Sequence, residues 1–258
     1  MDIIEKYISL LDDAIDFITT GFKTRRSIYT DKQFQEPGNI SVENEDGTLK
    51  EQFHEKDESS EKSFIKEKKL DSSVLLEEIN REIMECVKCP LHKSRLNPVP
   101  GKGNSNADIV FIGEGPGEME DLKGEPFVGR AGQLLTKMLN AIQLTRDEVY
   151  ITNIVKCRPP GNRTPQREEV NACFPYLERQ LEVIKPIIIC CLGGPAIKAL
   201  IKTDLGITKL RGKIHYYKDI PVIPTYHPAA VLRFPERYRR EVWNDLKLLK
   251  KFYMEIKK

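Results

Sequence analysis

The stretch from Ile109 to Leu135 reads IVFIGEGPGEMEDLKGEPFVGRAGQLL. Its first four residues form an apolar run, which suits a strand that is buried on both faces. The run ends in a turn at 113–117 with three glycines and a proline, and such a turn lets a ligand approach the backbone closely. Glu114 lies in this turn, where the carboxyl end of a parallel strand commonly opens onto a ligand crevice. With Phe127 and a helical segment following, the stretch predicts a pocket for a flat polar ligand.

The spacing of these glycines excludes two nucleotide-binding motifs. The dinucleotide fingerprint requires a third glycine at position 118, where the chain has Glu118. A P-loop requires Gly-Lys-Ser or Gly-Lys-Thr after the turn, and neither tripeptide follows. The sequence therefore predicts that the protein uses no nucleotide cofactor.

Strand and helix patterns alternate after this point. The strand candidates are 109–113, 149–155, 186–192 and 221–226, and helical patterns fit 131–143, 166–184, 195–203 and 236–256. A further helix is expected between a cap at 71–73 and Cys86. Such alternation is typical of a parallel sheet that is covered by helices. We expect an α/β fold of three layers, with a central four-stranded parallel sheet flanked by helices.

The N-terminal part of the chain has a different composition. Residues 2–21 place isoleucines and a leucine at helical spacing, at Ile4, Ile8, Leu11, Ile15 and Ile18. From 23 to 70 the chain is polar, charged and poor in aliphatic residues. We predict an N-terminal amphipathic helix at 1–22, a flexible polar linker at 23–70 and one folded domain at 71–258. The apolar face of the helix needs a surface to pack on, which could be the domain, another copy or a partner.

The distribution of charge and the hydropathy of the chain indicate which classes of protein it can belong to. The chain has 258 residues and a net charge of +2, but its last fifty residues hold 13 Lys or Arg against 5 Asp or Glu. This basic segment fits a polyanion partner, although a solvated helix face has the same composition. No run of eighteen apolar residues occurs, and the N-terminus lacks the basic start of a secretory signal. We therefore expect a cytoplasmic protein without a membrane span, in a reducing compartment.

Four of the six cysteines fall into two groups. Cys86 and Cys89 form a CxxC pair, and fifteen residues separate Cys157 from Cys173. Four thiolates from two loops can close a metal site, and both zinc and a 4Fe-4S cluster accept four Cys ligands. A thioredoxin-like redox pair is the alternative, but this CxxC precedes the first sheet strand instead of following one. The other two cysteines, Cys190 and Cys191, lie in an apolar run and are expected to be inert buried thiols.

Two polar residues stand out near the ends of the strand candidates. Asn153 lies within the strand candidate Ile151-Thr152-Asn153-Ile154-Val155, and asparagine is depleted in strands. Its amide offers a donor and an acceptor, which matches the edge of a pyrimidine, although a structural hydrogen bond to a loop would also explain it. His227 follows the last strand and precedes Pro228. Its ring can donate a hydrogen bond to a developing anion, although a lone histidine is more often structural.

Three segments resemble, in this order, the motifs of the family 4 uracil-DNA glycosylases. They are GEGPGEMEDLKGEPFVGRAGQLL at 113–135, TNIVKCRPPGNRTP at 152–165 and HPAAVLR at 227–233. The four outer cysteines resemble the ligands of that family's 4Fe-4S cluster. The resemblance covers roughly 80–250 and leaves out 1–70. It implies a DNA repair enzyme that hydrolyses the N-glycosidic bond of uracil in single- or double-stranded DNA, releases free uracil and leaves an abasic site.

The resemblance also implies how the base would be held. Phe127 would stack on a flipped-out uracil, Asn153 would read its polar edge, and His227 would bond the carbonyl oxygen that gains charge. Glu120 would crowd the place of the thymine methyl group, and the backbone at Gly115 and Pro116 would line the base.

Further implied roles concern water, DNA and metal. Some related families place an aspartate where Gly115 stands, so we expect the adjacent Glu114 to position or activate the water, with Glu118 as the alternative. Val231, Leu232 and Arg233 would enter the duplex beside the extruded nucleotide. Cys86, Cys89, Cys157 and Cys173 would hold one structural 4Fe-4S cluster.

Two other classes of protein remain open on the sequence. One is a non-catalytic, metal-bearing module that binds nucleic acid, and the other is an electron-transfer protein, which would lack a second cofactor motif here. In the glycosylase interpretation the substrate is uracil-containing DNA and the protein acts as a monomer. A replication clamp or another repair protein is the candidate partner of the N-terminal extension.

Overall fold

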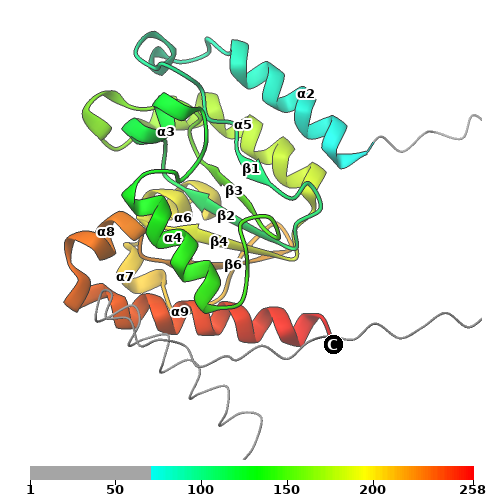
Figure 1. The fold of residues 1–258 in the computed structure, drawn as a ribbon, viewed down its shortest axis with the longest axis vertical. Coiled ribbons are helices and arrows are strands. Elements are labelled where there is room, and N and C mark those ends of the chain that lie inside the picture. Colours follow the sequence, from blue (N-terminus) through cyan, green and yellow to red (C-terminus); the bar gives the residue numbers. More distant parts are fainter. Residues whose placement is uncertain (1–70) are drawn as a thin grey trace, which may run out of the picture. The chain divides into compact units, whose positions relative to one another are not determined.

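The computed structural model describes residues 71–258 (Figure 1). The helix expected at 1–22 and the linker expected at 23–70 lie outside the described residues and stay predictions. Within 71–258, no helix is long and apolar enough to cross a membrane.

A six-stranded sheet in the order β1-β3-β2-β4-β6-β5 forms the centre of the domain. Its four inner strands are parallel, namely β3 (Tyr150–Asn153), β2 (Ile109–Gly113), β4 (Ile188–Leu192) and β6 (Ile220–Thr225). Every residue of β2, β3 and β4 is buried, because helices cover both faces of a parallel sheet. This confirms the four strands that the apolar runs predicted.

Two short antiparallel strands extend the predicted four-stranded parallel sheet at its edges. The strand β1 (Lys102–Gly103) pairs antiparallel with β3, and β5 (His215–Tyr217) pairs antiparallel with β6. These strands have two and three residues, which is too short for an alternating pattern to show in the sequence. The turn between β5 and β6 depends on Lys218, whose φ is 51°.

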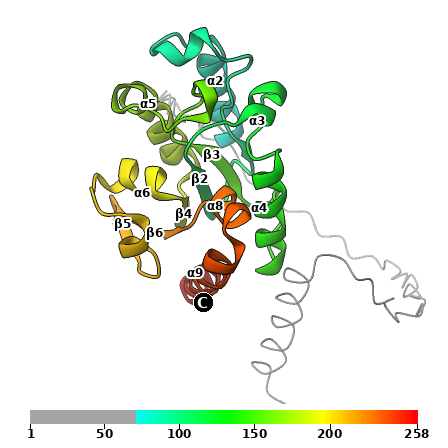
Figure 2. The same cartoon turned by 90° about the vertical axis from the view of Figure 1, so that its left-hand side faces the viewer.

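Helices cover both faces of the sheet, which confirms the expected three layers. In Figure 2, α5 (Arg167–Ile184) and α6 (Gly194–Ile201) lie on one side, and α4 (Arg130–Ala141) and α9 (Pro235–Ile256) lie on the other. The remaining helices are α2 (Ser72–Glu85), α3 (Glu118–Lys123), α7 (Ile207–Leu210) and α8 (Pro228–Arg233), with 3₁₀ turns at η1 (Pro90–Lys93) and η2 (Pro160–Asn162).

Local signals fix α2, which is followed by Cys86, and α5, which contains Cys173. Asp71 caps α2 by accepting a hydrogen bond of 3.1 Å from the backbone N–H of Ser73. The helix packs through Leu76, Ile79 and Ile83 and ends at Cys86. A capping box between Gln166 and Glu169 begins α5, which carries Cys173. Both helices belong to one hydrophobic core with the sheet.

The strand order creates a crevice at the carboxyl edge of the sheet. The chain passes from β2 to β3 on one side and then to β4 on the other side of β2. Ligands of open α/β sheets bind where connections diverge in this way. Gly113 at the end of β2 is paired with Asn153 at the end of β3, and His227 follows β6 at the same edge.

Candidate active site

A cavity of ≈ 440 Å³ opens at this edge of the sheet. Its volume falls in the range of small-molecule sites. Its lining includes all seven residues expected to hold the base and the water, namely Glu114, Gly115, Pro116, Glu120, Phe127, Asn153 and His227, and it also includes Arg233. Three segments that lie far apart in the sequence thus line one cavity.

The amide of Asn153 is buried at the base of this arrangement. Asn153 is 1% exposed, and its Oδ1 atom has no hydrogen-bond partner. A buried acceptor without a partner costs free energy, so it needs a donor from a ligand or water. A Cβ atom at Gly113 would lie 2.3 Å from this oxygen and 2.6 Å from Cζ of Phe127. Only glycine at 113 leaves both side chains in place.

The ring of Phe127 faces the imidazole of His227. Their centroids are 5.6 Å apart and their planes are tilted by 34°. Phe127 is buried, and its backbone has the unusual φ of 53°. A bulky residue adopts this left-handed conformation only when its surroundings impose it. The loop is therefore built to hold the ring where it is.

His227 is fixed in one orientation by the start of α8. Its Nδ1 atom accepts a hydrogen bond of 3.1 Å from the backbone N–H of Ala229. Burial lowers the pKa of His227 to about 4, and the charge of Glu120 opposes this shift only in part. The ring is neutral at pH 7, so with Nδ1 as acceptor its proton is on Nε2. His227 thus offers one N–H donor without carrying a charge.

The two candidate carboxylates differ in their surroundings. Glu114 is half-buried in the cavity wall, and burial raises its pKa against the opposing effect of a hydrogen bond with Thr164. Glu118 is 75% exposed, lies 3.9 Å from Nη1 of Arg158 and does not line the cavity. The geometry therefore favours Glu114 over Glu118 as the group that handles water.

Glu120 makes contacts that the motif did not reveal. Its Oε1 atom accepts hydrogen bonds of 2.8 Å from the backbone N–H groups of both Val128 and Gly129. The carboxylate therefore holds the segment that follows Phe127 while it lines the cavity.

Sequence reasoning also missed Lys156, which is fully buried behind Asn153. Its Nζ atom donates to the backbone oxygen of Asn153 at 2.8 Å, to Thr152 Oγ1 at 2.6 Å and to Gln180 Oε1 at 2.7 Å. Burial lowers its pKa to about 8. These bonds fix the carboxyl end of β3. The feature of the sequence that could have identified Lys156 was its position beside Cys157 in an otherwise apolar run.

Val231, Leu232 and Arg233, which are expected to enter the duplex, differ in their exposure. Val231 is 6% exposed, whereas Leu232 is 43% exposed and Phe234 is 52% exposed. The short helix α8 turns Val231 toward the interior and directs its neighbour outward. Arg233, also expected to contact DNA, lies at the exposed end of α8 and lines the cavity.

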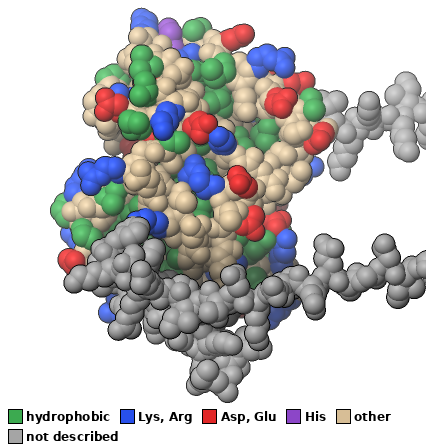
Figure 3. Space-filling model, viewed as in Figure 1, with side chains coloured by type: hydrophobic (Ala, Val, Ile, Leu, Met, Phe, Trp, Pro, Cys, Tyr) green, Lys and Arg blue, Asp and Glu red, His purple; other side chains and the backbone are tan. Residues whose placement is uncertain are grey.

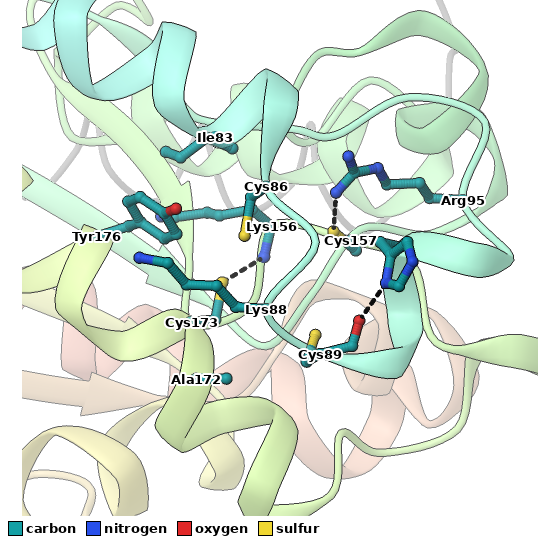
Figure 4. A pocket seen from close by; sticks show the side chains of 11 residues that line it. Ile83, Cys86, Lys88, Cys89, Arg95, Lys156, Cys157, Ala172, Cys173 and Tyr176 are labelled. Atoms are coloured by element: carbon teal, nitrogen blue, oxygen red, sulfur yellow. Dashed lines mark hydrogen bonds between the residues drawn. The ribbon is translucent and has the colours of Figure 1, made fainter.

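The four outer cysteines line one small pocket, as Figure 4 shows. Cys86 follows α2, Cys89 precedes η1, Cys157 follows β3 and Cys173 lies in α5. Two N–H donors point at sulfur: Arg95 Nη1 lies 3.0 Å from Cys157 Sγ, and the backbone N of Lys156 lies 3.2 Å from Cys173 Sγ. Such donors stabilise thiolates, so the pocket suits a thiolate-bound metal group.

The remaining two cysteines lie elsewhere. Cys190 and Cys191 are fully buried in the middle of β4, as the apolar run predicted. Burial raises the pKa of both thiols far above its usual range, so they stay protonated and unreactive.

Comparison with known proteins is consistent with this arrangement. Residues 100–247 match the family described as the Uracil DNA glycosylase superfamily. The type-4 uracil-DNA glycosylase of Archaeoglobus fulgidus is 53% identical over 180 residues, which cover 67% of this chain and 90% of that protein. The type-4 enzyme of Thermotoga maritima is 46% identical over 69% of this chain and 94% of that protein.

A more distant group matches less well. The type-5 uracil-DNA glycosylase of Pyrobaculum aerophilum is 34% identical over 52% of this chain and 66% of that protein. Both the identity and the coverage therefore favour the type-4 group. The chain belongs to the uracil DNA glycosylase superfamily, among the type-4 uracil-DNA glycosylases.

Proposed function

We propose that this protein is a DNA repair hydrolase that cleaves the N-glycosidic bond between uracil and deoxyribose. It releases free uracil and leaves an abasic site, which begins the repair of deaminated cytosine. The observation that supports this most strongly is the buried, unpartnered Oδ1 of Asn153 in a cavity with a neutral imidazole and an aromatic ring. Those three groups match a flat base with alternating donors and acceptors.

Recognition would depend on the polar edge of uracil. Uracil presents an N3–H donor between two carbonyl oxygens. Asn153 can accept from that N–H through Oδ1 and donate to a carbonyl through its amide nitrogen. Cytosine has the reverse pattern at these positions. Phe127 would stack on the base, and Glu120, in the wall of the same cavity, would disfavour the extra methyl group of thymine.

The leaving group would be stabilised by His227. As the bond from C1′ to N1 breaks, its electron pair moves onto uracil and gives the O2 carbonyl oxygen negative charge. The Nε2–H group of His227 can donate to that oxygen, and a neutral donor requires no proton to be exchanged first. The bond to Ala229 keeps this donor directed away from the start of α8.

The water would be handled by Glu114. Its raised pKa makes the carboxylate a better base than an ordinary glutamate. Water oxygen would bond to C1′ of the oxocarbenium-like sugar, and the proton of the water would pass to Glu114. The negative charge of the carboxylate would also stabilise the positive sugar.

DNA would be held at the rim of the cavity. On the face drawn in Figure 3, Lys and Arg side chains of the described residues are mixed with Asp and Glu side chains. Phosphate contacts are expected at Arg163 and Arg233, which line the cavity, and along the basic C-terminal segment. The exposed side chains of Leu232 and Phe234 would fill the gap left by the flipped nucleotide.

The four-cysteine pocket would hold one 4Fe-4S cluster. The four cysteines line one shared pocket, and their number matches one thiolate for each iron of such a cluster. When bound, the cluster would tie the ends of α2 and β3 to α5. Its role here is structural, and no step of the reaction uses it.

Two further proposals rest on the sequence. The protein would work in the reducing cytoplasm, where its cysteines stay free, and it would act as a monomer on uracil-containing DNA. The apolar stripe of residues 2–21 would bind a replication clamp or another repair protein. Loss of clamp binding on deletion of 1–22, with uracil excision unchanged, would support that partner.

The decisive experiment uses an oligonucleotide with a single uracil. The protein is incubated with it, the product is treated with alkali and the strands are sized on a gel. Cleavage at uracil, but not at cytosine or thymine in matched oligonucleotides, is the expected result. DNA binding without abasic sites would instead support a non-catalytic nucleic-acid-binding module.

A further inference from the structure

Phe127 is held by charged groups on both sides of its peptide backbone. On one side, Arg146 Nη2 donates to the carbonyl oxygen of Pro126 at 2.8 Å and Nη1 donates to that of Phe127 at 3.2 Å. On the other side, Glu120 Oε1 accepts from the next two backbone N–H groups at 2.8 Å each. The guanidinium of Arg146 thus donates to two carbonyl groups of this short loop, and the carboxylate of Glu120 accepts from two of its backbone N–H groups.

The loop has no room to relax. A Cβ atom at Gly132 would lie 1.8 Å from the carbonyl oxygen of Phe127, so α4 packs directly against that peptide group. At the other end, the ring rests against Gly113. The φ of 53° at Phe127 is disfavoured for a residue with a side chain, so outside contacts must maintain it.

Arg146 is placed for this purpose. It lies in the turn between α4 and β3, is half-buried, and does not line the cavity. Both of its hydrogen bonds go to this loop, which lies about twenty residues earlier in the chain. The fork of an arginine matches two successive carbonyl oxygens in a way that one ammonium group does not.

We propose that Arg146 is a positioning residue for uracil excision, which acts by holding Phe127 in the strained conformation that places its ring against the base. This inference rests on the proposed function. Arg146 touches neither the base nor the reacting atoms, so its effect passes through Phe127 alone. Misplacing a stacking group by about 1 Å can reduce a rate by about 10²-fold.

The test compares Arg146→Met, Arg146→Lys and a matched control, Lys102→Met. Lys102 forms an exposed ion pair of 2.8 Å with Glu125, which adjoins the same loop but leaves the peptides of Phe127 untouched. Single-turnover excision from a uracil-containing single strand and the dissociation constant for that strand are measured for each. Arg146→Met should lower the rate roughly 10- to 100-fold with little change in affinity, while Arg146→Lys retains part of the rate. Lys102→Met should match the wild type.

A double-mutant cycle separates positioning from a general structural role. In a Phe127→Ala background, Arg146→Met should lower the rate no further, because the residue through which it acts is gone. A full-size loss in that background would overturn the proposal, and so would a lowered melting temperature with an unchanged rate. If Arg146→Met does not fold, Arg146→Lys in both backgrounds decides the same question. Failure of the wild type to release uracil would instead refute the proposed function.

Discussion

The imidazole of His227 and the ring of Phe127 meet across the cavity with 5.6 Å between their centroids. One residue follows the last parallel strand and the other belongs to the loop between α3 and α4. Their meeting places a neutral hydrogen-bond donor beside an aromatic surface, which is the combination that an uncharged base requires before it leaves as an anion.

Replacing His227 with Gln tests the donor. The glutamine amide still carries an N–H donor, but it lacks the anchoring bond from Ala229 to Nδ1, so that donor is no longer preorganised. We expect excision at pH 7.5 to fall by about 10²- to 10³-fold, which is the usual cost of losing a preorganised donor to a developing anion. Single-turnover kinetics at saturating protein measure this, and a loss below threefold would contradict the role.

The lowered pKa of His227 predicts that the free energy of unfolding depends on pH. The folded pKa of about 4 lies below the ordinary value of 6.5, so between these pH values the unfolded chain binds more protons. Stability should therefore fall as the pH drops from 6.5 to 4, by at most about 3 kcal/mol from this group. Urea unfolding of the wild type and of His227→Gln across that window should give a steeper loss for the wild type. If the free energy of unfolding fell equally with pH in the wild type and in His227→Gln, that result would argue against a buried neutral ring at His227.

Glu114→Gln tests the carboxylate. The amide keeps the shape of the side chain but cannot accept a proton from water or stabilise a positive sugar. We expect a loss of about 10²- to 10⁴-fold in the excision rate on single-stranded uracil DNA. Glu118→Gln is the matched control and should retain the wild-type rate, because its side chain is exposed outside the cavity. A full rate in Glu114→Gln would refute the assignment.

Asn153→Asp tests the reading of the base. A carboxylate at this buried position cannot donate to the carbonyl of uracil, and its charge would be poorly solvated. Uracil excision should fall by roughly 10²-fold, consistent with losing a buried hydrogen bond to a ligand, and the preference for uracil over cytosine should shrink. Paired oligonucleotides with uracil or cytosine at the same position measure both. An unchanged preference would count against the amide as the reader of the base.

Cys157→Ser tests the metal group. The purified protein should be brown and should contain iron and not zinc. Cys157→Ser should lower its iron content, its visible absorbance and its melting temperature. Cys190→Ala is the matched control, because it removes an equally buried thiol in β4 and should leave the colour unchanged. Equal iron in both variants, or zinc in the wild type, would contradict a cluster at the four outer cysteines.

The sequence by itself determined the layers of the fold and the segments that supply the site. Buried parallel strands are almost purely apolar, so their runs predict β2, β3, β4 and β6 directly. Asparagine at 153 was visible because this residue type is depleted in strands. The number and spacing of the cysteines also predicted one shared site for the two groups, with a redox pair at Cys86 and Cys89 as the alternative.

Only the tertiary structure decided which side chains face the cavity. Val231 and Leu232 are neighbours with similar chemistry, yet one is buried and the other exposed, because the rotation of α8 separates them. The sequence already favoured Glu114 over Glu118, and the wall of the cavity, which includes Glu114 and not Glu118, supports that preference. Arg146 showed no local pattern, since its hydrogen bonds join segments about twenty residues apart. Local periodicity records burial within one element, whereas contacts between distant elements exist only once the chain has folded.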